Sequence, residues 1–444
     1  MRLFRLACAL AALLFSSVAA WAQNPFALKD GDRIVFYGDS ITDQRQYSTL
    51  VETYVLTRFP QMKVSFVHSG WGGDKVTGGQ GGAIDVRLQR DVVAHNPTVL
   101  TILLGMNDGY YKPFDAGLLD TFSRGYQRIV DVAKNSLPGV RITAIQTSPY
   151  DEVTRPPIFE GGYNNVLLRH GEVVAAIAKK EKLTFVDFNA PILAMLEKAK
   201  AENPALAAKI IPDRVHPGPA GHHVMAATLL KAWNAPAVVT AVEIDVAQLQ
   251  ATRADNTQVT EVLNGDTLSW IQTDLALPLP IEQKDTITAL GVRSSDVIND
   301  LAQQPLKIIN LEAGKYDFKI DGVSIGSFTE EQLAGGINLA TLQTPMMTQA
   351  AVVHAFTLQH NNVHFTRWRN LQVPLQNATF PAVQEAVKTS LEPLLAALDA
   401  EEASIVAKQR AAAQPIARRY ELIPIPLAPP PEEGGAEDVI IVVP

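Results

Sequence analysis

The sequence predicts an α/β domain built on a five-stranded parallel sheet with helices on both faces, followed by a smaller β-rich and helical C-terminal region. Between about residues 30 and 233, short apolar runs of strand length alternate with longer segments of helical spacing. Near-continuous apolar runs are typical of strands buried on both faces, so helices must cover both sides of the sheet. This alternation of strand and helix patterns ends near residues 235–236, where the second region begins.

The elements of the first domain are expected in strict alternation. The strands are predicted at 33–37, 63–67, 98–104, 140–147 and 183–188. The helices are predicted at 47–56, 84–94, 118–134 and 163–180. In such sheets, binding and catalytic residues gather outside the carboxyl ends of the strands, so the residues that follow the first three strands are expected to lie together.

The second region contains strand and hairpin signals. Residues 238–244 read as a strand, and two hairpins are predicted within 305–328, with turns at 312–314 and at Asp321-Gly322. Helices are expected at 294–304, 330–333 and 380–413, the last as one long helix or a helical pair with Pro393 near a break.

The two ends of the chain have their own composition. Residues 1–22 begin with two arginines near the N-terminus, continue with an apolar run and end in small residues. This pattern predicts a signal peptide. We therefore expect a first domain at 23–236, a β-rich accessory region with C-terminal helices at 237–414, and a flexible Pro-rich tail at 415–444.

Composition limits which cellular compartment and which classes of partner are expected. The only cysteine, Cys8, lies in the predicted signal, so an exported protein would have no disulfide. The formal net charge of −8, without a basic stripe, argues against nucleic acid as a partner. No later apolar run is long enough for stable membrane insertion. We expect a periplasmic or extracellular protein, and its oligomeric state stays open.

Four short motifs carry the chemistry. They are GDSIT at 38–42, GGD at 72–74, GMND at 105–108 and DRVH at 213–216. Together they supply a serine nucleophile, an acid and a histidine three residues apart, and groups able to hold an oxyanion. This set is sufficient for acyl transfer through a serine ester.

Each catalytic candidate also has a structural interpretation. Ser40 follows the first predicted strand and, taken alone, could simply cap a helix. Asp39 is adjacent to it and is expected to fix the turn through backbone hydrogen bonds. Asp213 and His216 lie in a Pro- and Gly-rich loop, where the carboxylate can reach the imidazole. Such a pair can also bind a metal or staple a loop, but no further ligand cluster accompanies it.

The motifs occur in the order typical of the SGNH hydrolase superfamily, also called GDSL esterases or lipases, which residues 31–233 resemble. The resemblance implies a flavodoxin-like sheet, an open site and carboxylic ester hydrolysis through an acyl-enzyme, with no cofactor and no metal. It also implies the triad Ser40, Asp213 and His216, and an oxyanion hole formed by Ser40, Gly73 and the Asn107 amide. The chain departs from the family where His68 replaces the asparagine usual a few residues before this glycine.

The substrate is less defined by the motifs. The aromatic candidates for the rim of the site are Trp71, Tyr110, Tyr111 and Tyr150, which could stack on a sugar, line an acyl slot or only pack in their loops. We expect a carbohydrate O-acetyl esterase acting on a small ester or acylated saccharide. A lipase, short-chain acyl or thioester hydrolase is the alternative. A carbohydrate- or partner-binding protein with an inactive hydrolase domain is the alternative of another class.

Overall fold

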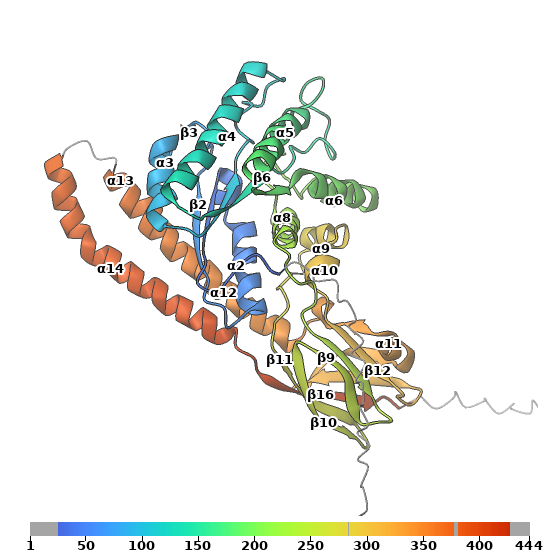
Figure 1. The fold of residues 1–444 in the computed structure, drawn as a ribbon. Helices are drawn as coiled ribbons and strands as arrows, with labels where there is room; N and C mark the ends of the chain where they lie inside the picture. The colour runs from blue at the N-terminus through green and yellow to red at the C-terminus, as the bar shows by residue number, and fades with distance from the viewer. Residues whose placement is uncertain (1–24, 283, 377–380, 427–444) are drawn as a thin grey trace, which may run out of the picture.

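The first domain is a parallel sheet of order β2-β1-β5-β6-β7 (Figure 1). The computed structural model describes residues 25–282, 284–376 and 381–426. The strands are β1 (Arg33–Gly38), β2 (Ser65–Gly70), β5 (Val99–Leu103), β6 (Arg141–Gln146) and β7 (Thr184–Asp187). This confirms the predicted fold class, and all five strands overlap their predicted ranges.

Helices cover both faces of this sheet. Along β1, Ile34 and Phe36 belong to one apolar core, while Val35 and Tyr37 belong to the core on the opposite face. The first core is closed by α2 (Gln46–Arg58), α6 (Asn189–Glu202) and α8 (Pro219–Ala232). The second is closed by α3 (Ile84–Asp91) and α4 (Ala116–Ser136), and α5 (Tyr163–Glu181) contributes to both. Alternate residues of one strand are therefore buried on opposite faces, which explains its uninterrupted apolar sequence.

The accessory region contains two further sheets. A five-stranded sheet has the order β10-β11-β16-β13-β14, and a four-stranded sheet has the order β15-β12-β8-β9. Their longer strands are β8 (Ala241–Asp245), β9 (Gln250–Asp255), β10 (Thr257–Asn264), β11 (Leu268–Asp274), β12 (Pro305–Ile309), β13 (Lys315–Ile320), β14 (Val323–Thr329) and β16 (Ala417–Pro424). The two sheets share one apolar core. Short helices, α9 (Thr286–Arg293), α10 (Val297–Leu301) and α11 (Glu330–Gly335), connect these elements.

Two predictions in this region are wrong for a shared reason. The turn at 312–314 does not close a hairpin, because β12 pairs with β8 and β15 while β13 lies in the other sheet. The place beside β13 is taken by β16, although residues 415–444 were expected to form a flexible tail. Tyr420 and Leu422 of β16 are fully buried in the core. Because this burial is favourable, β16 pairs with β13 although the two strands are far apart in sequence. The predicted turn at Asp321-Gly322 is confirmed between β13 and β14.

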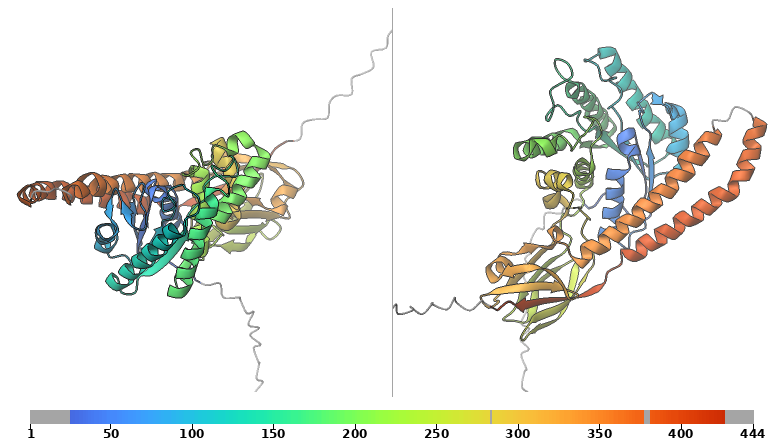
Figure 2. Two further views of the ribbon diagram at one scale, coloured as in Figure 1. Left: turned by 90° about the horizontal axis from the view of Figure 1, so that it is seen from above. Right: turned by 180° about the vertical axis from the view of Figure 1, so that it is seen from behind.

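A pair of long helices runs from the accessory sheets back along the first domain (Figures 1 and 2). It consists of α12 (Pro345–Phe365), the π-helical segment Thr366–Gln372 and α14 (Pro381–Ala412). Helix α12 was not expected from the sequence, whereas α14 is the single long helix that was one of the two alternatives there, and it continues through Pro393. No helix in the described part of the chain is long and apolar enough to cross a bilayer. The predicted signal peptide and residues 427–444 lie outside the described residues.

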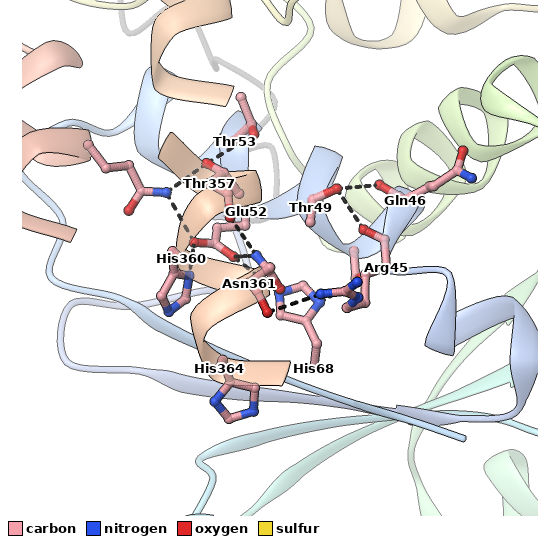
Figure 3. A network of polar contacts seen from close by, with 12 residues as sticks. Arg45, Gln46, Thr49, Glu52, Thr53, His68, Thr357, His360, Asn361 and His364 are labelled. Carbon is pink, nitrogen blue, oxygen red and sulfur yellow. Dashed lines mark hydrogen bonds and ion pairs between the residues drawn. The ribbon is translucent and has the colours of Figure 1, made fainter. Parts of the chain in front are cut away.

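The helix pair is held to the first domain by a buried polar network centred on Glu52 of α2 (Figure 3). One carboxylate oxygen of Glu52 is 3.1 Å from Nε2 of His68 and accepts from Asn361 at 3.2 Å. The other accepts from Gln409 of α14 at 3.1 Å and lies 3.2 Å from Nδ1 of His360. His68, the departure from the family pattern, thus belongs to this helix-docking network.

Charge pairing fixes the protonation of this network. Burial alone would raise the pKa of Glu52, but the adjacent His360 and the hydrogen bonds it receives hold that pKa below its usual range. Burial would likewise lower the pKa of His360, but Glu52 and Glu402 together raise it to about 10. The network therefore contains a buried ion pair between Glu52 and His360.

This ion pair predicts a pH-dependent stability increment. The pKa of His360 is higher in the folded state than the unfolded value of about 6.5, so its contribution is complete below that pH and is lost as the pH rises through about 10. We expect His360→Gln to lower the free energy of unfolding by roughly 3 kcal/mol near pH 6, and by progressively less towards pH 10. Urea unfolding across this range measures the difference.

The matched control is His364→Gln on the same helix. Burial holds the pKa of His364 well below its ordinary value, so this imidazole is neutral in the folded protein. Its substitution should produce a difference from wild type that does not change between about pH 7 and pH 10. A His360→Gln difference that is equally flat would contradict the ion pair.

Candidate active site

The turn after β1 places Ser40 at the carboxyl edge of the sheet. Asp39 caps the short helix α1 (Ser40–Asp43), its side chain accepting the N–H of Ile41 at 3.0 Å. Ser40 is the first residue of this helix. A Cβ on Gly38 would clash with the side chain of Thr42 and the carbonyl of Leu103, so this tight strand-to-helix turn needs glycine. Asp39 therefore shapes the turn, as predicted.

The DRVH loop brings an acid and an imidazole to this serine. Nε2 of His216 lies 2.8 Å from the Ser40 hydroxyl, and Nδ1 of His216 lies 2.6 Å from Oδ2 of Asp213. The other Asp213 oxygen accepts the N–H groups of His216 and Val215 at 2.8 and 3.0 Å. Burial would raise the pKa of Asp213, but these hydrogen bonds outweigh it and lower that pKa. The carboxylate stays ionised, and its hydrogen bond with Nδ1 fixes the orientation of the imidazole beside Ser40.

Arg155 holds this loop in place from outside the motifs. Its guanidinium donates to the carbonyls of Ala208, Ile211 and Pro212 at 2.8 to 2.9 Å. Arg214 adopts a left-handed conformation, with φ 73°, which reverses the chain between Asp213 and His216. No local sequence signal links Arg155 to this loop, because the three carbonyls lie more than 50 residues away along the chain.

Asn107, in the loop after β5, has a fixed side-chain amide. Its Nδ2 donates to the carbonyl of Asp74 at 3.0 Å, and its Oδ1 accepts the Tyr111 hydroxyl at 2.8 Å. Tyr110 and Tyr111 both adopt left-handed conformations, which fold the loop back over Asn107. One N–H of the amide remains for another acceptor, because an amide nitrogen carries two hydrogens.

Gly73 lies in the turn after β2. Its φ of +74° favours glycine, and a Cβ there would meet no atom within 4 Å, so the space beside it is open. The adjacent N–H of Gly72 donates to Asp43 of α1 at 3.1 Å, which joins this turn to the serine helix. The turn and Asn107 are also joined, since Asn107 bonds the carbonyl of Asp74. The four motifs thus form one hydrogen-bonded group of loops.

Comparison with known proteins agrees with this geometry. Residues 36–224 match the model of the GDSL-like lipase/acylhydrolase family. The first domain belongs to the SGNH hydrolase superfamily. An acetylxylan esterase of Geobacillus stearothermophilus is 27% identical over 223 residues, which is 45% of this chain and 93% of that protein. The chain is therefore a carboxylic ester hydrolase of the SGNH type.

A solved structure extends the likeness beyond the SGNH domain. A gut microbial diltiazem-metabolizing enzyme matches this chain with a TM-score of 0.76 and 25% sequence identity. The match covers 91% of this chain and 100% of that one. The accessory sheets and the helix pair are thus included in an architecture that the two proteins share.

Three buried carboxylates lie at the base of the SGNH site. Burial raises the pKa of Asp39 to about 8 and that of Asp108 to about 7, and each is raised further by neighbouring carboxylates. Burial also raises the pKa of Asp74, although its ion pair with Arg87 at 2.8 Å opposes the shift. The raised pKa values of Asp39 and Asp108 favour the neutral carboxyl, which reduces the negative charge beside the serine turn and the Asn107 loop.

The four aromatic candidates divide into two pairs. Tyr110 is 51% exposed and Tyr111 is 37% exposed, so both present surface at the rim beside Asn107. Trp71 and Tyr150 are buried. Trp71 packs in the protein interior against Trp368 of the accessory region, and Tyr150 packs edge-on against Tyr163. The structure thus brings only the first pair to the surface of the site.

The cavity at the triad includes a residue that sequence analysis missed. Ser40 and His216 line an open cavity of about 490 Å³ together with Phe365, the last residue of α12. Phe365 lies 325 positions after Ser40, and no local pattern indicates that the two share a cavity.

Proposed function

We propose that the chain is an exported carbohydrate O-acetyl esterase that acts through a serine acyl-enzyme. The observation that carries the chemistry is the continuous hydrogen-bonded line from Ser40 through His216 to Asp213. His216 takes the Ser40 proton as the hydroxyl attacks the acyl carbon, and then gives it to the departing alcohol oxygen. Water, activated by the same imidazole, attacks the acetyl-serine, releases acetate and restores the serine.

The oxyanion is assigned to three donors. These are the backbone N–H groups of Ser40 and Gly73 and the free N–H of the Asn107 side chain. The bonds of Asn107 to Asp74 and Tyr111 support this role, because they fix the amide before the reaction begins. Preorganised donors of this kind favour the transition state over the flat ester carbonyl.

Two features support an acetylated saccharide as substrate. The acetylxylan esterase is a relative over almost its whole length. The cavity beside Ser40 and His216 is open. In the loop that carries Asn107, the exposed Tyr110 and Tyr111 offer rings that can pack against the C–H face of a sugar. Export rests on the signal pattern of residues 1–22 and on the single cysteine within it.

A matched turnover screen tests this proposal. Acetylated xylosides and glucosides are compared with aryl acetate, butyrate and octanoate. We expect kcat/KM to be highest for the acetylated sugars and to fall as the acyl chain lengthens. A rate that rises with chain length would instead identify a lipid or long-chain acyl hydrolase.

A further inference from the structure

Helix α12 of the accessory region supplies one wall of the catalytic cavity. Phe365, at the end of this helix, lines the cavity with Ser40 and His216. The remaining wall is mainly polar and comes from the turn after α1 and from the DRVH loop. Its other lining residues are Asp43, Gln44, Arg45, Gln46, Pro212, Asp213, Pro217 and Gly218.

Arg45 fixes this wall relative to the nucleophile. It follows the serine helix in a left-handed conformation, with φ 56°. Its guanidinium donates to the carbonyl of Asn361 at 3.0 Å and to the side chain of Asn362 at 3.2 Å, and lies 4.6 Å from the Phe365 ring centre. The aromatic ring is therefore held by the turn that follows the serine helix.

Arg369 also holds this wall, its guanidinium lying 5.8 Å from the Phe365 ring centre. It lies in the π-helical segment directly after Phe365, and such segments are frequent at functional sites. Its guanidinium stacks on Trp71, with 3.0 Å to the ring centre, and forms an ion pair with Asp43 at 3.6 Å. Asp43 in turn holds Gly72. The guanidiniums of two anchored arginines thus lie near the Phe365 ring, Arg45 at 4.6 Å and Arg369 at 5.8 Å from its centre.

The lining indicates which part of an ester this cavity receives. It contains His216 and Asp213 but neither Gly73 nor Asn107, so it lies on the imidazole side of Ser40. The departing oxygen must meet Nε2 of His216 to be protonated, so the alcohol part of the ester lies on this side. In this lining the aromatic ring of Phe365 lies beside the side-chain amides of Gln44 and Gln46. Such a lining suits an alcohol part that has both apolar C–H surface and hydroxyl groups.

We propose that Phe365 and the turn of residues 43–46 form the alcohol subsite of the enzyme, with a pyranose ring as its occupant. The identity of this occupant rests on the proposed function, whereas the position of the subsite rests on the geometry. The accessory helix is then a specificity element of the hydrolase. It completes the active site and does not form a separate binding module.

The test compares ring and small alcohols in Phe365→Ala and Phe365→Leu. Acetylated methyl xylopyranoside is the ring substrate, and ethyl acetate has an alcohol too small to reach Phe365. We expect Phe365→Ala to lower kcat/KM about tenfold for the xyloside, mainly through KM, and less than about twofold for ethyl acetate. Phe365→Leu keeps apolar volume and should show a smaller loss. Val352→Ala, an exposed position on the same helix, is the control and should match wild type for both esters.

The outcomes separate this inference from the proposed function. Equal losses for both esters, or no loss for either, would overturn the alcohol subsite. If wild type hydrolyses ethyl acetate but not the acetylated xyloside, the saccharide assignment fails. Cyclohexyl acetate then replaces the xyloside, and a loss confined to this ring ester would still support a ring-alcohol subsite, whereas an equal loss for both esters would reject it.

Discussion

Replacing Ser40 with alanine is expected to reduce turnover by roughly a thousandfold or more, with the fold intact. The substitution removes the nucleophile that lies 2.8 Å from Nε2 of His216 and leaves the imidazole and oxyanion donors without an attacking group. Initial rates with an aryl acetate measure the loss. Ser136→Ala, at an exposed serine that ends α4, is the matched control and should retain the parent rate. A folded Ser40→Ala protein with undiminished turnover would end the proposed mechanism.

Asn107→Ala is expected to lower kcat by about a hundredfold, since one preorganised oxyanion donor contributes roughly 3 kcal/mol to transition-state stabilisation. The effect should appear in kcat more than in KM, because the donor acts on charge that develops only during the reaction. Steady-state kinetics with the aryl acetate separate the two constants.

Tyr111→Phe is the control for this substitution. It removes the hydroxyl that donates to Oδ1 of Asn107 but leaves the amide donor in place, so its effect on kcat should be much smaller. If Asn107 were only structural, Asn107→Ala would lower the melting temperature, and the folded fraction would keep near-normal kcat.

Much of the first domain could be predicted from sequence because its signals are local. Each strand coincides with a near-continuous apolar run, and the first three motifs follow strand ends, so topology alone brings Ser40, Gly73 and Asn107 to one edge. The contact between Asp213 and His216 is also local, since the two residues are three positions apart.

The rest depends on contacts between distant segments. The strand β16 is adjacent to prolines in sequence, and its place between β11 and β13 is set by partners about 100 to 150 residues earlier. Phe365 and Arg369 show no catalytic pattern of their own. They matter because buried groups on α2, such as Glu52, dock α12 against α2, the helix that follows the serine helix. The periodicity of apolar residues predicts that a segment is buried, but it does not identify the segments that pack against it.

The most direct test of the serine mechanism is the site of covalent inactivation by diethyl p-nitrophenyl phosphate, located by peptide mass mapping. This reagent phosphorylates an activated serine and leaves a stable adduct in place of the transient acyl-enzyme. We predict loss of activity in proportion to labelling, with the adduct on Ser40 and with no labelling of Ser40→Ala. Full activity in the presence of excess reagent, or an adduct on another residue, would contradict Ser40 as the nucleophile.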